Sequence, residues 1–309
     1  MSALSLVQPG RFVSKNFVML SVIITAKDEA KTVGLAVNSF LNEKYKYEFE
    51  IIVAAPDRQT LKAAKRAWPG VKMVQDGKRG KAAAMNLAIN EAKGDVLIFS
   101  DGDVFVQSGA VANLLNVNNA ELVSARPIAA GHKKINKYIF WQQSLFDMAH
   151  KLRSQRAEKG KFLAISGYLF LIKKSILADF KLPENLLAED EYLSYWAWHK
   201  GYRIKYAANA LVNVKYPDNY QDWVKQKTRT LAGSYQIPKA WKKVAMRSFA
   251  RESFKAWQMW ISYVTSPVQA CWMILLFMAR LDVWLRAFWK VKILKHSRQQ
   301  IWQRVESSK

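Results

Sequence analysis

Clustered carboxylates near the ends of predicted strands are the residues of this chain whose types and spacing best suit chemistry. Asp101 and Asp103 flank Gly102 directly after the apolar run DVLIFS, so both side chains can turn toward one point. Hard oxygen ligands of this kind suit Mg²⁺ or Mn²⁺, with water and substrate phosphates completing the coordination. The tripeptide alone favours a simple turn, because Asp and Gly are turn residues. Its position after a buried strand favours the metal site.

A second acidic cluster, Glu189-Asp190-Glu191, precedes a helical pattern over residues 190–199. A carboxylate placed beside a substrate hydroxyl can act as a general base. Acidic residues also favour the first turn of any helix, because they interact well with the helix dipole. The triplet alone therefore fits either role. The four histidines lack paired spacing and are not expected to bind a metal.

Strand and helix patterns alternate through the first hundred residues. Apolar runs predict strands at 17–25, 48–54, 71–74 and 95–100, and helical spacing predicts helices at 29–42, 58–67 and 80–92. This order predicts an α/β fold with a mostly parallel sheet and flanking helices. Ligands bind at the carboxyl ends of the strands in such sheets, where Glu29, Asp57 and the two DGD aspartates would gather. The chain has neither a GxGxxG nor a GxxxxGK[ST] motif.

Several segments, in order over about residues 18–235, resemble the inverting family 2 glycosyltransferases, which have the GT-A fold. They are SVIITAKDEA, EFEIIVAAPD, GKRGKAAAMNLAINEAKGDVLIFSDGDV, ISGYLFLIKKSIL, AEDEYLSYWAWHKGYRIKY and QKTRT. The last segment is similar to the family element QxxRW, except that Thr230 replaces the tryptophan. This departure argues against processive polymer synthesis. The order of the segments makes the resemblance more specific than any one of them.

The resemblance implies a Rossmann-like GT-A domain that binds a nucleotide-sugar, with a UDP-sugar expected, and uses Mg²⁺ or Mn²⁺. It implies Asp190 as the catalytic base and assigns roles to further residues: Thr25, Ala26, Glu29, Asp57, Lys81 and Asp101 to the donor nucleotide, Asp103 and Asp101 to the metal, and Glu189, Gln226 and Arg229 to the acceptor or phosphates. Lys81 begins a predicted helix, a position that suits a phosphate or a simple cap. Gln226 and Arg229 share a helix face, which could equally be a solvated basic surface.

The formal net charge of +24 is unevenly distributed along the 309 residues. Residues 239–309 carry 14 basic and 3 acidic side chains and hold seven of the twelve tryptophans. A basic surface indicates an anionic partner, such as nucleic acid, a phosphorylated substrate or phospholipid headgroups. No nucleic-acid-recognition motif occurs, so nucleic acid is not expected. The composition of this tail favours an anionic membrane surface.

The tail also contains 24 consecutive uncharged residues, 256–279, divided near the middle by Pro267. About 20 apolar residues span a bilayer, but equally basic flanks favour keeping both ends on the cytoplasmic side. We therefore expect a re-entrant or interfacial helical hairpin broken at Pro267, with a single transmembrane helix or a helical pair packed on the body as alternatives. The hairpin would place five tryptophans at the membrane interface: Trp257, Trp260, Trp272, Trp284 and Trp289.

Three segments are thus predicted: an N-terminal extension (1–16), a GT-A catalytic domain (17–238) and membrane-associated helices (239–309). The predicted function is a membrane-associated, metal-assisted inverting glycosyltransferase at the cytoplasmic face of the cell membrane, acting on a lipid-linked or glycan acceptor. The single cysteine, Cys271, fits a reducing compartment. Alternatives are a polyprenyl-phosphate sugar synthase of the same fold and a basic membrane- or nucleic-acid-binding scaffold without activity.

Overall fold

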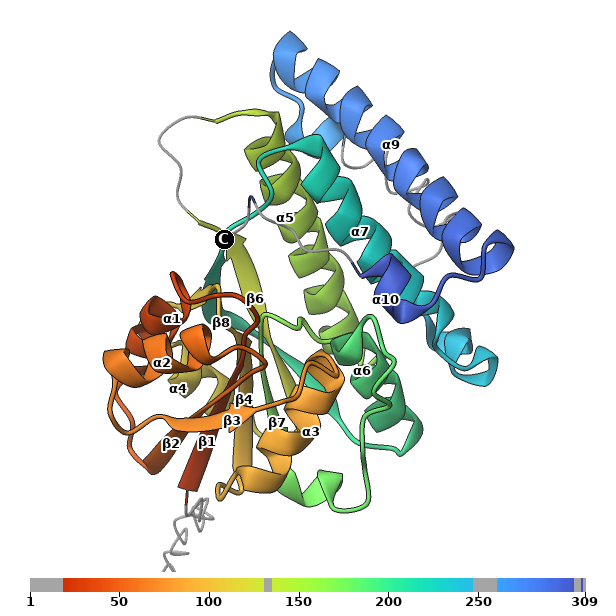
Figure 1. Cartoon of the computed structure of the whole chain (residues 1–309). Helices are drawn as coiled ribbons and strands as arrows, with labels where there is room; N and C mark the ends of the chain where they lie inside the picture. The colour runs from red at the N-terminus through yellow and green to blue at the C-terminus, as the bar shows by residue number, and fades with distance from the viewer. Residues whose placement is uncertain (1–18, 131–134, 247–259, 303–306, 308–309) are drawn as a thin grey trace, which may run out of the picture.

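An eight-stranded sheet lies at the centre of the molecule, with helices on both faces and a further group of helices packed above it (Figure 1). The computed structural model describes residues 19–130, 135–246, 260–302 and 307. The predicted extension, 1–16, falls outside these residues. The strands are β1 (Met19–Thr25), β2 (Glu48–Ala55), β3 (Lys72–Gln75), β4 (Val96–Asp101), β5 (Val104–Val106), β6 (Leu122–Ala129), β7 (Leu169–Lys173) and β8 (Ile204–Val214).

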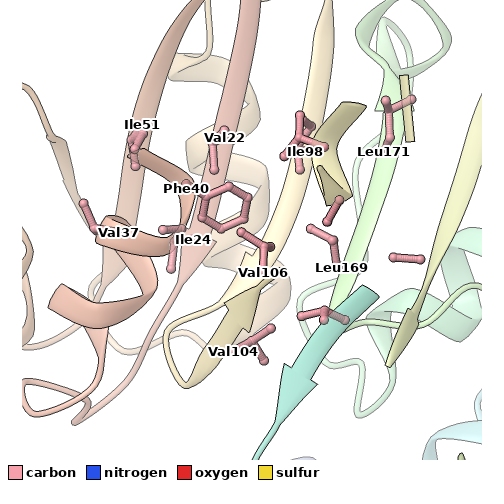
Figure 2. Close-up of a cluster of buried hydrophobic side chains, with 14 of the residues drawn as sticks. Val22, Ile24, Val37, Phe40, Ile51, Ile98, Val104, Val106, Leu169 and Leu171 are labelled. Carbon is pink, nitrogen blue, oxygen red and sulfur yellow. The ribbon is translucent and has the colours of Figure 1, made fainter. Parts of the chain in front are cut away.

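The first half of the sheet is parallel, as predicted. Strand β1 pairs in parallel with β2 and β4, and β2 pairs in parallel with β3. Apolar side chains alternate between the two faces of β1. Val22 and Ile24 enter one core with Phe40 (Figure 2), whereas Ile23 enters the core on the other face. The run from Leu20 to Ile24 is therefore buried on both sides, which explains its nearly continuous hydrophobicity.

The second half of the sheet is mixed. The strand order is β3-β2-β1-β4-β7-β6-β8-β5. Strand β7 runs antiparallel to both of its neighbours, β4 and β6, and β5 runs antiparallel to β8. The chain reaches β7 only after two other strands and a long helix, so no direct crossover imposes a parallel direction on it. This reversal differs from the mostly parallel sheet that the strand and helix pattern predicts.

Most of the predicted helices agree with the structure to within one residue at each end. The helices are α1 (Val33–Leu41), α2 (Arg58–Ala67), α3 (Lys81–Glu91), α4 (Ala110–Leu115), α5 (Lys137–Glu158), α6 (Glu189–His199), α7 (Tyr220–Tyr235), α9 (Pro267–Phe288) and α10 (Arg298–Ile301). Helix α1 begins four residues later than predicted, because the amide groups of Thr32 and Val33 both donate to the carbonyl of Glu29 and form a turn.

Helix α9 differs from the predicted hairpin. Ser266 caps its first turn by accepting a hydrogen bond from the amide of Gln269, and Pro267 occupies the first helical position, where its missing N–H is not needed. The helix continues past Arg280 to Phe288. The prediction of two short arms on either side of Pro267 is therefore wrong for the second arm, and residues 256–259 of the first arm lie outside the described residues.

The inner face of α9 packs against α5 and α7 (Figure 1). Its buried side chains are Met273, Leu276, Ala279, Val283 and Ala287, which contact a core that includes Trp141 and Trp223. Trp272 and Trp284 lie partly within the same core, so these two predicted interfacial tryptophans also pack inward. Within the described residues, 267–293 is the one helical segment long and apolar enough to cross a membrane.

Candidate active site

The carboxyl ends of β1 and β4 bring the first predicted site residues together. Thr25 lies opposite Asp101 in the parallel register. The Thr25 hydroxyl donates a hydrogen bond to Asp101 Oδ1 over 3.0 Å, and Lys81 Nζ forms an ion pair with the same oxygen at 2.6 Å. Lys81 reaches this point because it begins α3, which starts beneath the strand ends. The Asp101 carboxylate is thus fixed by two elements besides its own strand.

The glycine of the DGD sequence permits close packing above this carboxylate. A Cβ atom at Gly102 would lie 2.7 Å from the Cβ of Ala26 and would also collide with the carboxylate of Glu29. Ala26 and Glu29 therefore cover the turn between Asp101 and Asp103. This explains on steric grounds why the residue between the two aspartates lacks a side chain.

The second acidic cluster reaches the same place from α6. The amide of Gly167 donates a hydrogen bond to Asp190 Oδ2 over 2.9 Å. A Cβ atom at Gly167 would lie 2.9 Å from that oxygen and 3.1 Å from Asp190 Cγ, so this contact also depends on a glycine. Asp190 lies in the first turn of α6, and the Gly167 amide, which precedes β7, fixes one oxygen of its carboxylate.

Lys81 connects the two acidic clusters electrostatically. Burial lowers the pKa of Lys81, but the charges of Asp101, Glu189 and Asp190 outweigh burial and raise its pKa overall. Burial raises the pKa of Glu189, and the charge of Lys81 opposes that rise only in part. The ammonium group of Lys81 therefore interacts with carboxylates from both β4 and α6. Asp101 of the DGD sequence and the predicted base Asp190 share this cation.

Helix α7 supplies the predicted residues of the QxxR element. Gln226 and Arg229 both line the cavity described below. Gln226 Oε1 is buried and has no hydrogen-bond partner within the described part of the chain. The hydroxyl of Thr230, which replaces the expected tryptophan, donates to the backbone carbonyl of Gln226 over 3.1 Å. Thr230 also lines the cavity, so this element contributes no aromatic ring to the cavity wall.

These residues surround one cavity of about 790 Å³. Its polar half is formed by the strand ends and by the starts of α3 and α6. Its other half is largely apolar and is formed by α5, α9 and the apolar side chains of α7, whereas Gln226 and Arg229 of α7 belong to the polar half. Side chains of the apolar half include Leu145, Phe146, Met148, Leu152, Trp223, Val283 and Trp284.

Asp57 is the one predicted site residue that does not line this cavity. It caps α2 by accepting a hydrogen bond from the amide of Thr60, and it accepts a second from the amide of Asp28, both over 2.8 Å. Burial tends to raise the pKa of Asp57, but these hydrogen bonds, including one from the Thr60 side chain, lower it overall. Asp28 adopts a left-handed conformation with φ 54°. Asp57 thus stabilises the loop after β1.

The structure adds cavity residues that the motifs did not single out. Tyr168 follows Gly167 and lines the cavity; burial raises its pKa, as do the charges of Asp103 and Asp101. Lys27, Arg298 and Trp302 also line it. The segment ISGYLFLIKKSIL contains Tyr168, so that resemblance could have indicated it. No local pattern connects the C-terminal residues to the strand ends.

The carboxylates of Asp101 and Asp103 are compatible with a divalent cation that has few protein ligands. Among the described residues, no group of three or more His, Cys, Asp or Glu side chains is arranged to hold a metal. Asp101 and Asp103 nevertheless present carboxylate oxygens at the cavity wall. Mg²⁺ in nucleotide enzymes is commonly bound through one or two carboxylates, with phosphates and water completing the octahedron. The two aspartates fit that type of site.

Comparison with protein families identifies the chain. The family model described as Glycosyl transferase family 2 matches residues 21–180, just over half of the sequence. The chain belongs to glycosyl transferase family 2. A second model, Glycosyl transferase family group 2, matches residues 115–291 and so includes all of α9. The cavity at the strand ends is accordingly the candidate active site of a glycosyltransferase.

Two curated relatives share 27% identity with the chain. Probable glycosyltransferase YdaM of Bacillus subtilis (strain 168) aligns over 242 residues, covering 72% of this chain and 57% of the relative. Poly-beta-1,6-N-acetyl-D-glucosamine synthase of Staphylococcus aureus (strain COL) aligns over 164 residues, covering 52% of this chain and 40% of the relative. The chain therefore spans only about half the length of these relatives.

Solved structures show that the fold is GT-A. Mannosyltransferase PcManGT from Pyrobaculum calidifontis, solved with GDP-Man and Mn²⁺, has a TM-score of 0.65 at 16% identity and covers 90% of this chain and 88% of its own. Glucosyl-3-phosphoglycerate synthase from Mycobacterium tuberculosis, solved with Mn²⁺, UDP and phosphoglyceric acid, has a TM-score of 0.50 at 16% identity, covering 72% and 80%.

Proposed function

We propose that this glycosyltransferase transfers a sugar from a UDP-sugar to a hydroxyl group of a lipid-linked or glycan acceptor, with inversion, at the cytoplasmic face of the cell membrane. The acceptor oxygen forms a bond to the anomeric carbon while the bond from that carbon to the diphosphate breaks. The nucleoside diphosphate leaves, and the hydroxyl proton passes to Asp190. The observation that carries this proposal is that Asp101, Lys81 and Asp190 line one cavity, with Lys81 Nζ 2.6 Å from Asp101 Oδ1.

Asp190 is suited to act as the base because, among the described residues, one of its two oxygens has a hydrogen-bond partner. The Gly167 amide binds Oδ2, which leaves Oδ1 as the atom proposed to accept the proton. A base positioned within hydrogen-bonding reach typically contributes 10²–10⁴-fold to the rate. A hydroxyl acceptor needs such a base, whereas a phosphate monoester is already largely deprotonated at pH 7. The held carboxylate therefore favours a hydroxyl acceptor over a polyprenyl phosphate.

The donor is proposed to lie along the polar half of the cavity. Asp101 and Asp103 would hold Mg²⁺ or Mn²⁺, and a bound ion would stabilise the charge of the departing diphosphate. The side chains of Lys27, Lys81 and Arg229 line the same wall and supply further positive charge. Thr25, Ala26 and Glu29 shape the floor beside the DGD turn. Cations that surround carboxylates in this way fit an anionic donor that arrives with a metal ion.

The apolar half of the cavity supports an acceptor with a hydrophobic part. This half extends from the carboxylates to Val283 and Trp284 on α9. A glycan alone would leave such side chains facing water or polar groups, at a free-energy cost set by the apolar area that stays hydrated. A lipid-linked acceptor would cover them.

The outward face of α9 supports placement at a membrane. Exposed apolar side chains recur along its whole length, about 33 Å at 1.5 Å per residue: Val268, Ile274, Leu275, Met278, Leu281, Leu285 and Phe288. Lys290, Lys292 and Lys295 follow directly after the helix. Because the inner face is packed along the body, we propose that α9 lies in the plane of the membrane interface with its flanking cations at the headgroups.

A donor screen with purified protein and Mn²⁺, measuring release of nucleoside diphosphate, tests the activity. We expect one nucleotide-sugar to be turned over, and Asp103→Asn and Asp190→Asn each to reduce that turnover at least 100-fold without unfolding the protein. Asp179→Asn, which changes an exposed aspartate outside the cavity, is the matched control and should leave the rate unchanged. Turnover close to wild type in both cavity variants would remove the catalytic assignment.

A further inference from the structure

The segment from Arg298 to Trp302 contains α10 and packs against the active site from the far end of the sequence (Figure 1). Ile301 is buried against Leu187, which lies two residues before Glu189, and against Ala232 of α7. The prediction of membrane-associated helices over 239–309 included this segment, which lies far from the ends of β1 and β4 in the chain.

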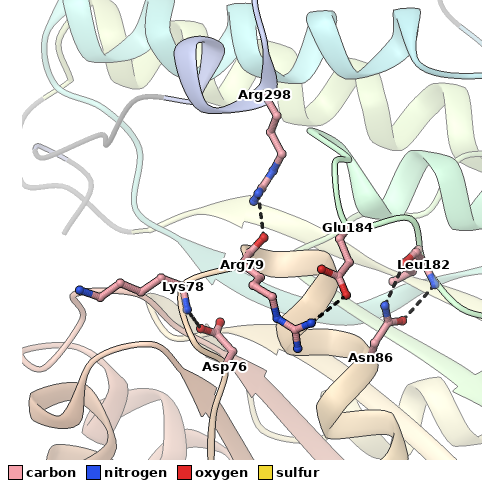
Figure 3. Close-up of polar contacts among 7 residues, drawn as sticks. All are labelled: Asp76, Lys78, Arg79, Asn86, Leu182, Glu184 and Arg298. Atoms are coloured by element: carbon pink, nitrogen blue, oxygen red, sulfur yellow. Dashed lines mark hydrogen bonds and ion pairs between the residues drawn. The ribbon is translucent and has the colours of Figure 1, made fainter.

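Arg298 joins two loops that position catalytic candidates. Its Nη1 donates to the carbonyl of Arg79 over 2.9 Å, and its Nε donates to the carbonyl of Leu186 over 3.0 Å. Figure 3 shows the first of these bonds, with Arg79 in turn directed at Glu184. The two loops lead into α3 and α6, which carry Lys81 and Asp190. Arg298 therefore connects the start of the donor-side helix to the start of the helix that holds the base.

Gly80 makes this connection possible. Its φ of +105° is strained for residues with a side chain, and a Cβ atom there would collide with the guanidinium group of Arg298. The arginine thus lies directly on the backbone in front of Lys81. The contact between Arg298 and the backbone therefore requires a glycine at position 80.

Trp302 presents its ring to two cations of the cavity wall. Lys27 Nζ lies 4.1 Å from the ring centroid, and Arg229 Cζ lies 5.9 Å from it. All three side chains line the cavity. Lys27 follows β1 and Arg229 comes from α7, so the ring lies between the parallel half of the sheet and the helical layer. Cation–π contacts of this kind are worth about 0.5–2 kcal/mol.

We propose that Trp302 is a donor-binding residue whose indole ring stacks on the nucleobase, and that Arg298 is the positioning residue that keeps it there. This rests on the proposed function, because it takes the cavity to hold a nucleotide-sugar. The ligand class follows from the neighbours: an aromatic face suits a flat base, and the adjacent Lys27 and Arg229 suit its phosphates. The Arg298 bond holds this segment against the loop before α3, and the ring lies beside Lys27, which follows β1.

Calorimetric titration of the full chain with UDP and with GDP, each in the presence of Mn²⁺, tests this proposal. Trp302→Leu keeps apolar packing against Ile301 but removes the ring, so we expect it to weaken binding of the preferred nucleotide about 10-fold or more. Trp302→Phe retains a ring and should stay within about threefold of wild type. Trp289→Leu, at a tryptophan of the same tail that is 57% exposed and outside the cavity, is the matched control and should bind like wild type.

Kinetics separate the role of Arg298 from general stabilisation. Arg298→Ala should raise the KM for the donor several-fold without changing the KM for the acceptor, and Arg298→Lys should restore part of the loss. Unchanged or tighter nucleotide binding by Trp302→Leu would overturn the proposal, the latter because the ring would then obstruct the site. If wild-type protein binds neither nucleotide, the nucleotide site of the proposed function fails, which is a distinguishable result.

Discussion

Gly167→Ala would place a methyl group against the carboxylate of Asp190. The added Cβ would lie 2.9 Å from Oδ2 and 3.1 Å from Cγ, whereas ordinary contact begins at 3.4 Å. The carboxylate must therefore move by about 0.5 Å, or the loop before β7 must move instead. A displacement of about 1 Å at a reacting group can reduce a rate 10²-fold. We therefore expect kcat to fall about 10-fold, with overpacking destabilising the protein by about 1–3 kcal/mol.

Nucleoside diphosphate release at saturating donor measures kcat, and urea denaturation measures the free energy of unfolding. Gly34→Ala provides the control, because its Cβ would make only ordinary contacts, with the Cβ of Ala67 at 3.5 Å and the carbonyl oxygen of Ala63 at 3.8 Å. Gly34 also lies inside α1, where alanine is the better helix former. That variant should be fully active and up to about 1 kcal/mol more stable. A folded Gly167→Ala protein with kcat within twofold of wild type would refute the reasoning that this glycine positions the base.

Three further outcomes are expected. A hydrogen bond from Arg203 lowers the pKa of Glu121 to about 2; Glu121→Gln should therefore lose about 1–2 kcal/mol of stability at pH 7, after a discount for the exposed arginine, and the difference from wild type should disappear as the pH falls from 4.5 toward 2 in denaturation curves. Met278→Asp, at a 63% exposed position of α9, should reduce co-flotation with anionic vesicles, whereas Leu35→Asp, at a 59% exposed position of α1, should not. Lys81→Met should reduce nucleoside diphosphate release at least 10-fold, because it removes the cation shared by the two acidic clusters.

The parallel half of the sheet and its edge could be predicted because their signals are local. A strand buried on both faces requires a run such as Leu20 to Ile24, and parallel pairing then brings the strand ends together. Thr25 opposite Asp101 follows from this register. Gly102 was visible beside the two aspartates in the sequence as well, but the contacts of Gly102 and Gly167 depend on side chains distant in the chain.

Features that depend on long-range packing could not be predicted. The antiparallel direction of β7 leaves no mark in LFLIK, because a buried strand has the same composition in either direction. The proline of α9 is equally ambiguous, since Pro267 can break a helix or begin one, and here the Ser266 cap settles the matter. Trp302 was grouped with the other tail tryptophans by composition, whereas its neighbours come from β1 and α7.

Helix α9 has the cavity on one side and its exposed apolar stripe on the other. Arg280, Val283 and Trp284 face the cavity, while Leu281 and Leu285 face outward. Only one helix, about 10 Å across, separates the two. With the stripe at a bilayer, an acceptor would need to lift its hydroxyl by little more than that distance and could keep its tail among the lipids. Turnover would then follow the number of acceptors per unit area, so that added inert lipid would slow the enzyme at a constant bulk acceptor concentration.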